Sequence, residues 1–215
     1  AWQEGHRRLY QQLKDSVPYH PEGLTGLQPL YQAVVHGCRA GLYQETCTEV
    51  YRDRILRGAG PGGFYSTKKL GAFGADLGAL ACFFAEPWQR LVPGLSVDAQ
   101  AWLLGEAAFS LRALGRLAEA QEPMRAGAQM DVERADWKNA AVSYSNLSEL
   151  QLSLGRTALA VADAERAVDY ADRCGDAFER IIERTTLADA CHQQGEREAA
   201  RRGFAEAEAI QAERE

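Results

Sequence analysis

The sequence lacks the features that mark several classes of protein. Its longest apolar run, residues 70–84, has 15 residues and contains Asp76, so it is too short to span a bilayer comfortably. Basic residues are in the minority, with 24 Lys and Arg against 30 Asp and Glu and a net charge of −6. Nucleic-acid binders usually carry a basic stripe or patch instead. We therefore expect neither a membrane nor a nucleic acid as partner.

Cysteine is scarce and carries no metal-binding pattern. The count of five is odd, no CxxC occurs, and every cysteine lies in a stretch of helical pattern. The pairs His36/Cys38 and Cys191/His192 each offer two ligands, and adjacent helical positions point about 100° apart. We expect no metal, no cofactor, and small core cysteines in a reducing compartment, which indicates a cytoplasmic protein.

The common catalytic and nucleotide-binding motifs are also absent. No GxSxG occurs, and the four histidines are scattered without a paired nucleophile. Gly58 and Gly63 have the spacing of a P-loop, but Phe64 and Tyr65 stand where that loop needs Lys and then Ser or Thr. We expect no enzyme activity, and a flexible loop between helices at this point.

What the chain does contain is an interval of 40 residues. Three residues suited to cap a helix N-terminus recur at this interval: Ser96, Asp136 and Asp176. Each is followed 19 positions later by a glycine suited to end a helix: Gly115, Gly155 and Gly195. Three copies in register predict an array of helix pairs.

Small residues recur at the same interval. Three positions counted from each glycine hold nine small residues: Ala108, Ser148, Ala188, Ala120, Ala160, Ala200, Gly127, Ala167 and Ala207. Antiparallel helices that cross closely require such residues. Larger apolar residues between them, such as Leu111, Leu147 and Leu187, are the expected core.

These residues resemble the tetratricopeptide repeat (TPR). Leu-Gly-Arg-Leu-Ala-Glu-Ala at 114–120 and Leu-Gly-Arg-Thr-Ala-Leu-Ala at 154–160 are similar to the turn and second-helix start of that motif. The period of 40 departs from the usual 34. The resemblance implies an all-α fold, a right-handed superhelical solenoid of antiparallel helix pairs.

We expect one domain over residues 1–215, with three regular 40-residue repeats over 96–215 and degenerate repeats over 1–95. The first half contains two expected loops, 58–65 and 86–95, the second with one short turn anchored by Trp88. The expected helices there are an opening helix with Trp2, Leu9 and Leu13 on its apolar side, a pair turning at Gly41, and a helix from Ser66 or Thr67 to about Ala85.

Residues 31–84 also resemble the repeat region that follows the nucleotide-binding module in bacterial STAND-type ATPases, the class of NACHT and NB-ARC proteins. That resemblance implies a sensor or regulatory scaffold whose partner module lies elsewhere in a longer protein. The chain begins at Ala1 without methionine and ends in a continuing helical pattern, so we expect a fragment.

In the TPR family the first helix of each pair lines the inner face. Carried over by alignment on the turn glycines, the binding residues are Trp102, Phe109, Arg112, Asn146, Glu149, Asp189 and His192. Asn146 stands where the family often places an asparagine that hydrogen-bonds a peptide backbone. The basic clamp for a peptide carboxylate is absent. The alternative, that these are exposed helical side chains without a ligand, stays open.

Asp76 is the only charge between Lys69 and Glu86. Because an unpaired buried charge is costly, we expect Asp76 to meet water, a cation or a helix N-terminus, with Lys69 on roughly the same helix face, or to contact a ligand. The leading hypothesis is a non-enzymatic scaffold that binds a protein or peptide segment. A small-molecule sensor and a structural or oligomerisation spacer are the alternatives.

Overall fold

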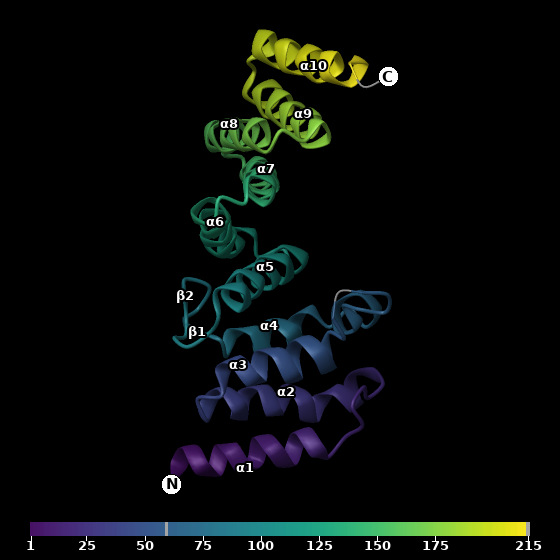
Figure 1. Ribbon diagram of the computed structural model, residues 1–215, viewed down its shortest axis with the longest axis vertical. Helices are drawn as coiled ribbons and strands as arrows, with labels where there is room; N and C mark the ends of the chain where they lie inside the picture. Colours follow the sequence, from purple (N-terminus) through teal and green to yellow (C-terminus); the bar gives the residue numbers. More distant parts are fainter. Residues whose placement is uncertain (59, 214–215) are drawn as a thin grey trace. The chain divides into compact units, whose positions relative to one another are not determined.

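Helices make up most of the chain in the computed structural model, which describes residues 1–58 and 60–213 (Figure 1). The chain divides into two units, unit 1 from Ala1 to Arg116 and unit 2 from Leu117 to Glu215. Within the described residues, no helix combines the length and the apolar character needed to cross a bilayer. The expectation of a single domain stays a prediction.

Unit 1 contains α1 (Trp2–Asp15), α2 (Gly23–Arg39), α3 (Tyr43–Glu45), the π-helix η1 (Thr46–Ile55), the π-helix η2 (Tyr65–Lys69), α4 (Phe73–Ala81), β1 (Phe84–Glu86), β2 (Arg90–Leu91) and α5 (Val97–Ala113). Helix α1 packs on α2, α2 packs on η1 and α4, and α4 packs on α5. The helix pair expected around Gly41 is therefore present, with its first helix starting earlier than expected.

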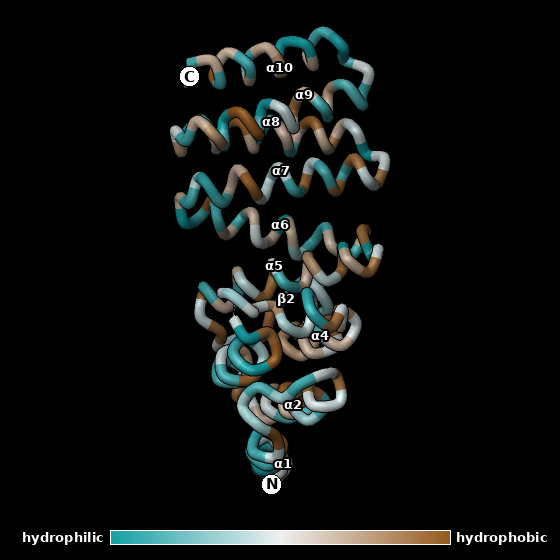
Figure 2. The backbone as a smooth tube through the Cα atoms, turned by 90° about the vertical axis from the view of Figure 1, so that its right-hand side faces the viewer, coloured by the Kyte–Doolittle hydropathy of each residue, from teal (hydrophilic) through white to brown (hydrophobic). Residues whose placement is uncertain are grey.

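Unit 2 contains α6 (Leu117–Glu133), α7 (Trp137–Ser153), α8 (Thr157–Cys174), α9 (Ala177–Gln194) and α10 (Arg197–Ala212). Helix α7 packs on α6, α8 and α9, and α9 also packs on α8 and α10. Apolar and polar residues alternate along these helices rather than gathering at one end (Figure 2). Each helix therefore has one face for the core and one for solvent.

The repeated caps and glycines form as predicted. The side chains of Ser96 and Asp136 accept backbone N–H bonds three residues on, and that of Asp176 accepts from both Phe178 and Glu179. Each turn glycine has a positive φ, 72° at Gly115, 71° at Gly155 and 93° at Gly195. Because residues with a Cβ rarely adopt this conformation, glycine recurs there.

The small residues that the repeat interval marks in unit 2 are buried, in keeping with the predicted close crossing of helices, except Gly127, which is half-buried. Ala160, Ala167 and Ala188 have no exposed surface, and neither has Ser148. Two apolar clusters fill the space between helices, one around Tyr144 and Leu147, the other around Ala164 and Ala190.

The prediction of one continuous helix from Ser66 or Thr67 to about Ala85 is wrong. The chain turns after η2, with φ of +64° at Gly71, and α4 begins at Phe73. Lys69 and Asp76 therefore belong to different helices, and their seven-residue separation does not place them on one helix face.

The segment expected to be mostly loop contains a short antiparallel hairpin of β1 and β2. The loop expected over 86–95 therefore includes β2 and the last residue of β1. Trp88 sits in the hairpin turn with φ of +63°, is 8% exposed, and packs its ring 5.3 Å from that of Phe84. The predicted anchoring role of Trp88 thus fits the hairpin.

Helix α1 also differs from expectation. Trp2 is 65% and Leu9 42% exposed, and the buried residue is Tyr10. The connection from α1 to α2 is held by Arg54 of η1, whose guanidinium donates to the carbonyls of Lys14, Val17, Pro18 and Tyr19 at 2.8 to 3.2 Å. Buried residues in η1 come in pairs every four positions. This spacing is wider than the 3.6 of an α-helix and suits i→i+5 bonding.

The ends of α6 and α8 allow a direct test of backbone strain. Ala135, after α6, has φ of 54°, and Gly175, after α8, has φ of 73°. A Cβ in this region costs roughly 1 kcal/mol. We expect Ala135→Gly to stabilise the chain by about 0.5–1 kcal/mol and Gly175→Ala to destabilise it by a similar amount, measured by urea unfolding. Equal effects of the two variants in the same direction would contradict this account.

Candidate functional site

The candidate site is a surface formed by the solvent side of two packed helices in unit 2. It comprises Val142, Asn146 and Glu149 of α7 with Ile182, Thr186 and Asp189 of α9, and is named here the α7/α9 face. Each α9 residue stands 40 positions after its α7 counterpart. Because α7 and α9 pack together, equivalent positions of two repeats lie on one surface.

This register divides the α7/α9 face into chemical bands. Val142 and Ile182, 38% and 37% exposed, form an apolar band near the N-terminal ends of the helices. Asn146 and Thr186 form a polar band, and Thr186 accepts a hydrogen bond from Ser145 at 3.1 Å. Glu149 and Asp189, both exposed, follow as an acidic band. One surface therefore offers apolar contact, hydrogen bonding and negative charge in a fixed order.

A buried carboxylate lies between the two helices. Glu183 of α9 is 1% exposed, and its Oε2 has no hydrogen-bond partner. Burial raises its pKa to about 7, and the charges of Glu179 and Glu149 add to this, while the Ser145 hydroxyl opposes it. The interaction with Glu149 couples Glu183 to the acidic band.

Ion pairs fix α9 against its neighbours. Lys138 of α7 contacts both Asp176 and Glu179 at 3.2 Å. Asp172 of α8 accepts from Arg180 at 2.9 Å and from Arg184 at 2.8 Å. These partly exposed contacts add to the packing of α9 on α7 and α8, which keeps the order of bands on the α7/α9 face fixed.

The predicted binding residues fall into two groups. Asn146, Glu149 and Asp189 lie on the α7/α9 face, and His192 is exposed on the next turn of α9. Asp189 also accepts a long hydrogen bond of 3.5 Å from Gln193 Nε2. The binding role of these four residues stays a prediction.

The other three predicted residues belong to α5 in unit 1. Trp102 is half-buried, with its ring centroid 5.7 Å from that of Tyr51. Phe109 is 45% exposed and meets the ring of Phe73 edge-on at 5.8 Å. Arg112 is half-buried. Trp102 therefore contributes to packing within unit 1, whereas Phe109 offers an exposed aromatic edge.

The two additional predicted residues, Lys69 and Asp76, differ in their surroundings. Lys69 in η2 is exposed, with its Nζ 5.2 Å from the ring centre of Tyr65. Asp76 in α4 has no exposed surface, and its Oδ1 accepts from the Tyr31 hydroxyl at 3.0 Å. The partner of Asp76 is thus a hydroxyl of α2 rather than the expected water, cation or helix N-terminus, and its ligand role stays a prediction.

Asp76 belongs to a buried polar cluster in unit 1. Burial raises its pKa to about 6, against the opposing effect of the Ser66 and Tyr31 hydroxyls. Glu106 of α5 has its pKa raised to about 7, first by burial and then by the charge of Asp76. The fully buried hydroxyl of Tyr51 has no partner, and burial raises its pKa well above the usual range. The cluster therefore disfavours a second negative charge.

Sequence reasoning missed Glu106 and Glu183, as well as the apolar band. Glu106 stands 40 residues before Asn146, so the repeat interval alone could have drawn attention to it. Glu183 lies three residues after Arg180 and directly before Arg184. Such mixed charges are typical of a solvated helix face, so no sequence signal marks Glu183 as buried.

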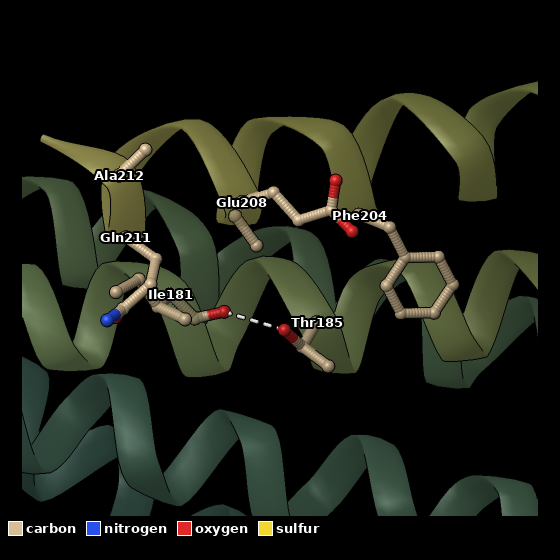
Figure 3. A pocket seen from close by; sticks show the side chains of 7 residues that line it. Ile181, Thr185, Phe204, Glu208, Gln211 and Ala212 are labelled. Carbon is tan, nitrogen blue, oxygen red and sulfur yellow. Dashed lines mark hydrogen bonds between the residues drawn. The ribbon is translucent and has the colours of Figure 1, made fainter.

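A pocket of about 470 Å³ lies between α9 and α10 in unit 2. Ile181 and Phe204 provide apolar lining, and Thr185, Glu208 and Gln211 provide polar groups (Figure 3). The Thr185 hydroxyl donates to the carbonyl of Ile181 at 2.9 Å. The volume lies within the range of small-molecule sites, whereas the pocket is wide open to solvent. No group of three or more His, Cys, Asp or Glu suited to a metal ion occurs in residues 1–58 and 60–213.

The sequence matches no protein-family model and no curated protein. Among solved structures, the chain is similar to a kinesin light chain-like protein of Podosopora anserina with nearly identical TPR-like repeats: the TM-score is 0.59 at 16% identity, covering 100% of this chain and 95% of that one. A variant of that protein with one substitution gives a TM-score of 0.54 at 16% identity, covering 99% and 93%. BtubC (BKLC) from P. vanneervenii has a TM-score of 0.41 at 12% identity, covering 98% of this chain and 90% of that one. This TM-score is too low to inform the fold.

At these identities the likeness shows the fold alone. The chain has an all-α fold of TPR-like helical repeats, as the sequence predicts. The right-handed superhelix implied by the TPR resemblance stays a prediction.

The buried cluster of unit 1 should make stability depend on pH. The pKa of Asp76 rises from its ordinary 3.8 to about 6, so the folded state holds a proton that the unfolded chain has released. Stability is then greatest below about pH 4 and falls until about pH 6. At about 1.4 kcal/mol for each pH unit of difference, we expect Asp76→Asn to gain about 2 kcal/mol over the parent between pH 4 and pH 7.

Urea unfolding of the full chain at pH 4, 5, 6 and 7 measures this effect. Glu106→Gln should shift stability in the same direction, because the pKa of Glu106 is raised as well. Asp53→Asn, at an exposed position of η1, is the control and should follow the parent profile. Parallel profiles for Asp76→Asn and the parent would show that Asp76 is ionised at little cost.

Proposed function

We propose that this chain is a non-enzymatic scaffold that binds a protein or peptide segment on the α7/α9 face. The observation that supports the proposal is the shared register of the two helices, which places like residues of successive repeats next to one another. A partner can then contact two helices with one continuous segment. Repeat proteins use such extended surfaces for binding.

The chemistry of the bands supports the same proposal. A single exposed apolar residue is ordinary on a protein surface. Here Val142 and Ile182 occupy equivalent positions of packed helices, and Phe178, 55% exposed, lies one turn before Ile182. The Asn146 amide can both donate and accept, which suits the backbone of a bound segment. Apolar contact supplies affinity and the polar band supplies orientation.

The test is selection of binding peptides from a displayed library of random 12-residue sequences, with the full chain as target. We expect selected peptides to lose affinity by about tenfold or more on a Val142→Ser/Ile182→Ser variant, because both apolar contacts are removed. Fluorescence polarisation of labelled peptides measures the loss.

Leu159→Ser is the matched control, since Leu159 of α8 is 46% exposed and lies outside the face. Thermal unfolding should show that all variants fold like the parent. Selected peptides that bind the double variant and the parent equally well would place binding elsewhere and remove the support for the α7/α9 face.

We also propose that the scaffold is the sensor or regulatory repeat region of a bacterial signalling ATPase. The support is the resemblance of residues 31–84, including the segment from Phe64 to Asp76, to the repeats of STAND proteins. The proposal predicts a nucleotide-binding module, with GxxxxGK[ST] after a hydrophobic strand, in the full-length protein. A full-length sequence without that module would contradict it.

A further inference from the structure

We propose that the segment bound on the α7/α9 face is extended and carries a Lys or Arg three residues from an apolar side chain. The inference rests on the proposed function of this face and specifies the chemistry of the partner. Three observations carry it: the acidic band, the buried Glu183, and the distance between the apolar and acidic bands.

The acidic band alone would not define a site, but Glu183 adds an independent observation. Unit 2 buries three carboxylates among its described residues, Asp163, Glu179 and Glu183. Asp163 lies 3.6 Å from Arg125 and 3.8 Å from Arg166, and Glu179 lies 3.2 Å from Lys138.

Glu183 differs from the other two. In the part of the chain that the structure describes, no ion pair involves Glu183, and its Oε2 has no hydrogen-bond partner. Asp163 Oδ2 also lacks a hydrogen bond, but the two arginines compensate its charge. A buried carboxylate is normally paired, because removing its charge from water is costly. The charge of Glu149 is among the causes that raise the pKa of Glu183, after burial. A cation brought to the acidic band by a partner would be attracted by Glu149 and Asp189, and its charge would favour the ionised form of Glu183.

The polar band favours an extended segment over a helix. Asn146 and Thr186 offer a side-chain amide and a hydroxyl between the apolar and acidic bands. The backbone groups of a helix are already bonded to one another, whereas those of an extended segment are available to such side chains.

The spacing of the bands sets the spacing of the partner's side chains. Val142 and Glu149 are seven residues apart on one helix. At 1.5 Å per residue the distance along the axis is about 10 Å. A polyproline II segment rises 3.1 Å per residue with three residues per turn, so side chains three positions apart lie on one side about 9 Å apart. An apolar residue at the first position and Lys or Arg at the fourth then match both bands.

The peptides selected from the displayed 12-residue library test this inference. Among peptides that lose affinity on Val142→Ser/Ile182→Ser, we expect Lys or Arg three positions from an apolar residue at about three times the library frequency or more. Selected peptides should bind more weakly at 500 mM than at 50 mM NaCl, because salt screens exposed charges.

A Glu149→Gln/Asp189→Asn variant should weaken the binding of these peptides by about tenfold, since both carboxylate charges are lost while side-chain shape is kept. Glu165→Gln is the control, because Glu165 is exposed on α8 outside the face, and should change affinity by less than twofold. In the labelled peptide itself, Arg→Glu should abolish measurable binding.

The possible outcomes separate this inference from the proposed function. Face-dependent peptides without an excess of basic residues, or with affinity unchanged on Glu149→Gln/Asp189→Asn, would overturn the inference and leave the face as a binding surface. Basic residues enriched seven rather than three positions from the apolar residue would indicate a helical partner and overturn the extended segment. An absence of face-dependent peptides would overturn the proposed function and the inference with it.

Discussion

The close crossing of helices at small residues is the constraint on which unit 2 depends. Ala160 and Ala188 have no exposed surface, and a Cβ added at Gly203 of α10 would lie 3.0 Å from the Cβ of Ala188. Helices in such contact cannot slide without a clash, because protein interiors are closely packed. Their register is therefore fixed, and residues 40 positions apart meet on one surface. The bands of the α7/α9 face follow from packing on the opposite sides of the same helices.

Local signals predicted the regular half of the chain well, and the reasons are physical. A cap such as Asp176 and a glycine such as Gly195 act on their own helix ends, so they can be read without the rest of the fold. The first half depends on contacts between distant segments. The π-helix around Arg54, the turn at Gly71 and the hairpin around Trp88 form where η1, α4 and the chain after it meet other elements. Local secondary-structure propensity does not predict such contacts between distant segments.

The candidate site was predictable only in part for a similar reason. Repeat position identifies which residues share a face, so Asn146, Glu149 and Asp189 could be grouped from the sequence, and Glu106 could have been added by the same interval. The burial of a charged residue, by contrast, cannot be predicted from repeat position. Glu183 has the neighbours of a solvated residue in sequence, and its carboxylate is buried only because α9 packs against other helices. The raised pKa of such a buried carboxyl therefore depends on tertiary packing and cannot be read from the sequence.

The two units treat buried carboxylates in different ways. In unit 1, Asp76 is stabilised by the Tyr31 hydroxyl, and the proximity of Glu106 raises the cost of a second charge. In unit 2, Glu183 is buried beside the proposed binding face, and burial raises its pKa to about 7. A ligand that binds only the folded state stabilises it, so a cationic partner on this face would link binding to the stability of the helix stack. In the proposed complex, this linkage would allow a scaffold without catalytic groups to respond to its partner, since the ligand shifts the balance between states that it binds unequally.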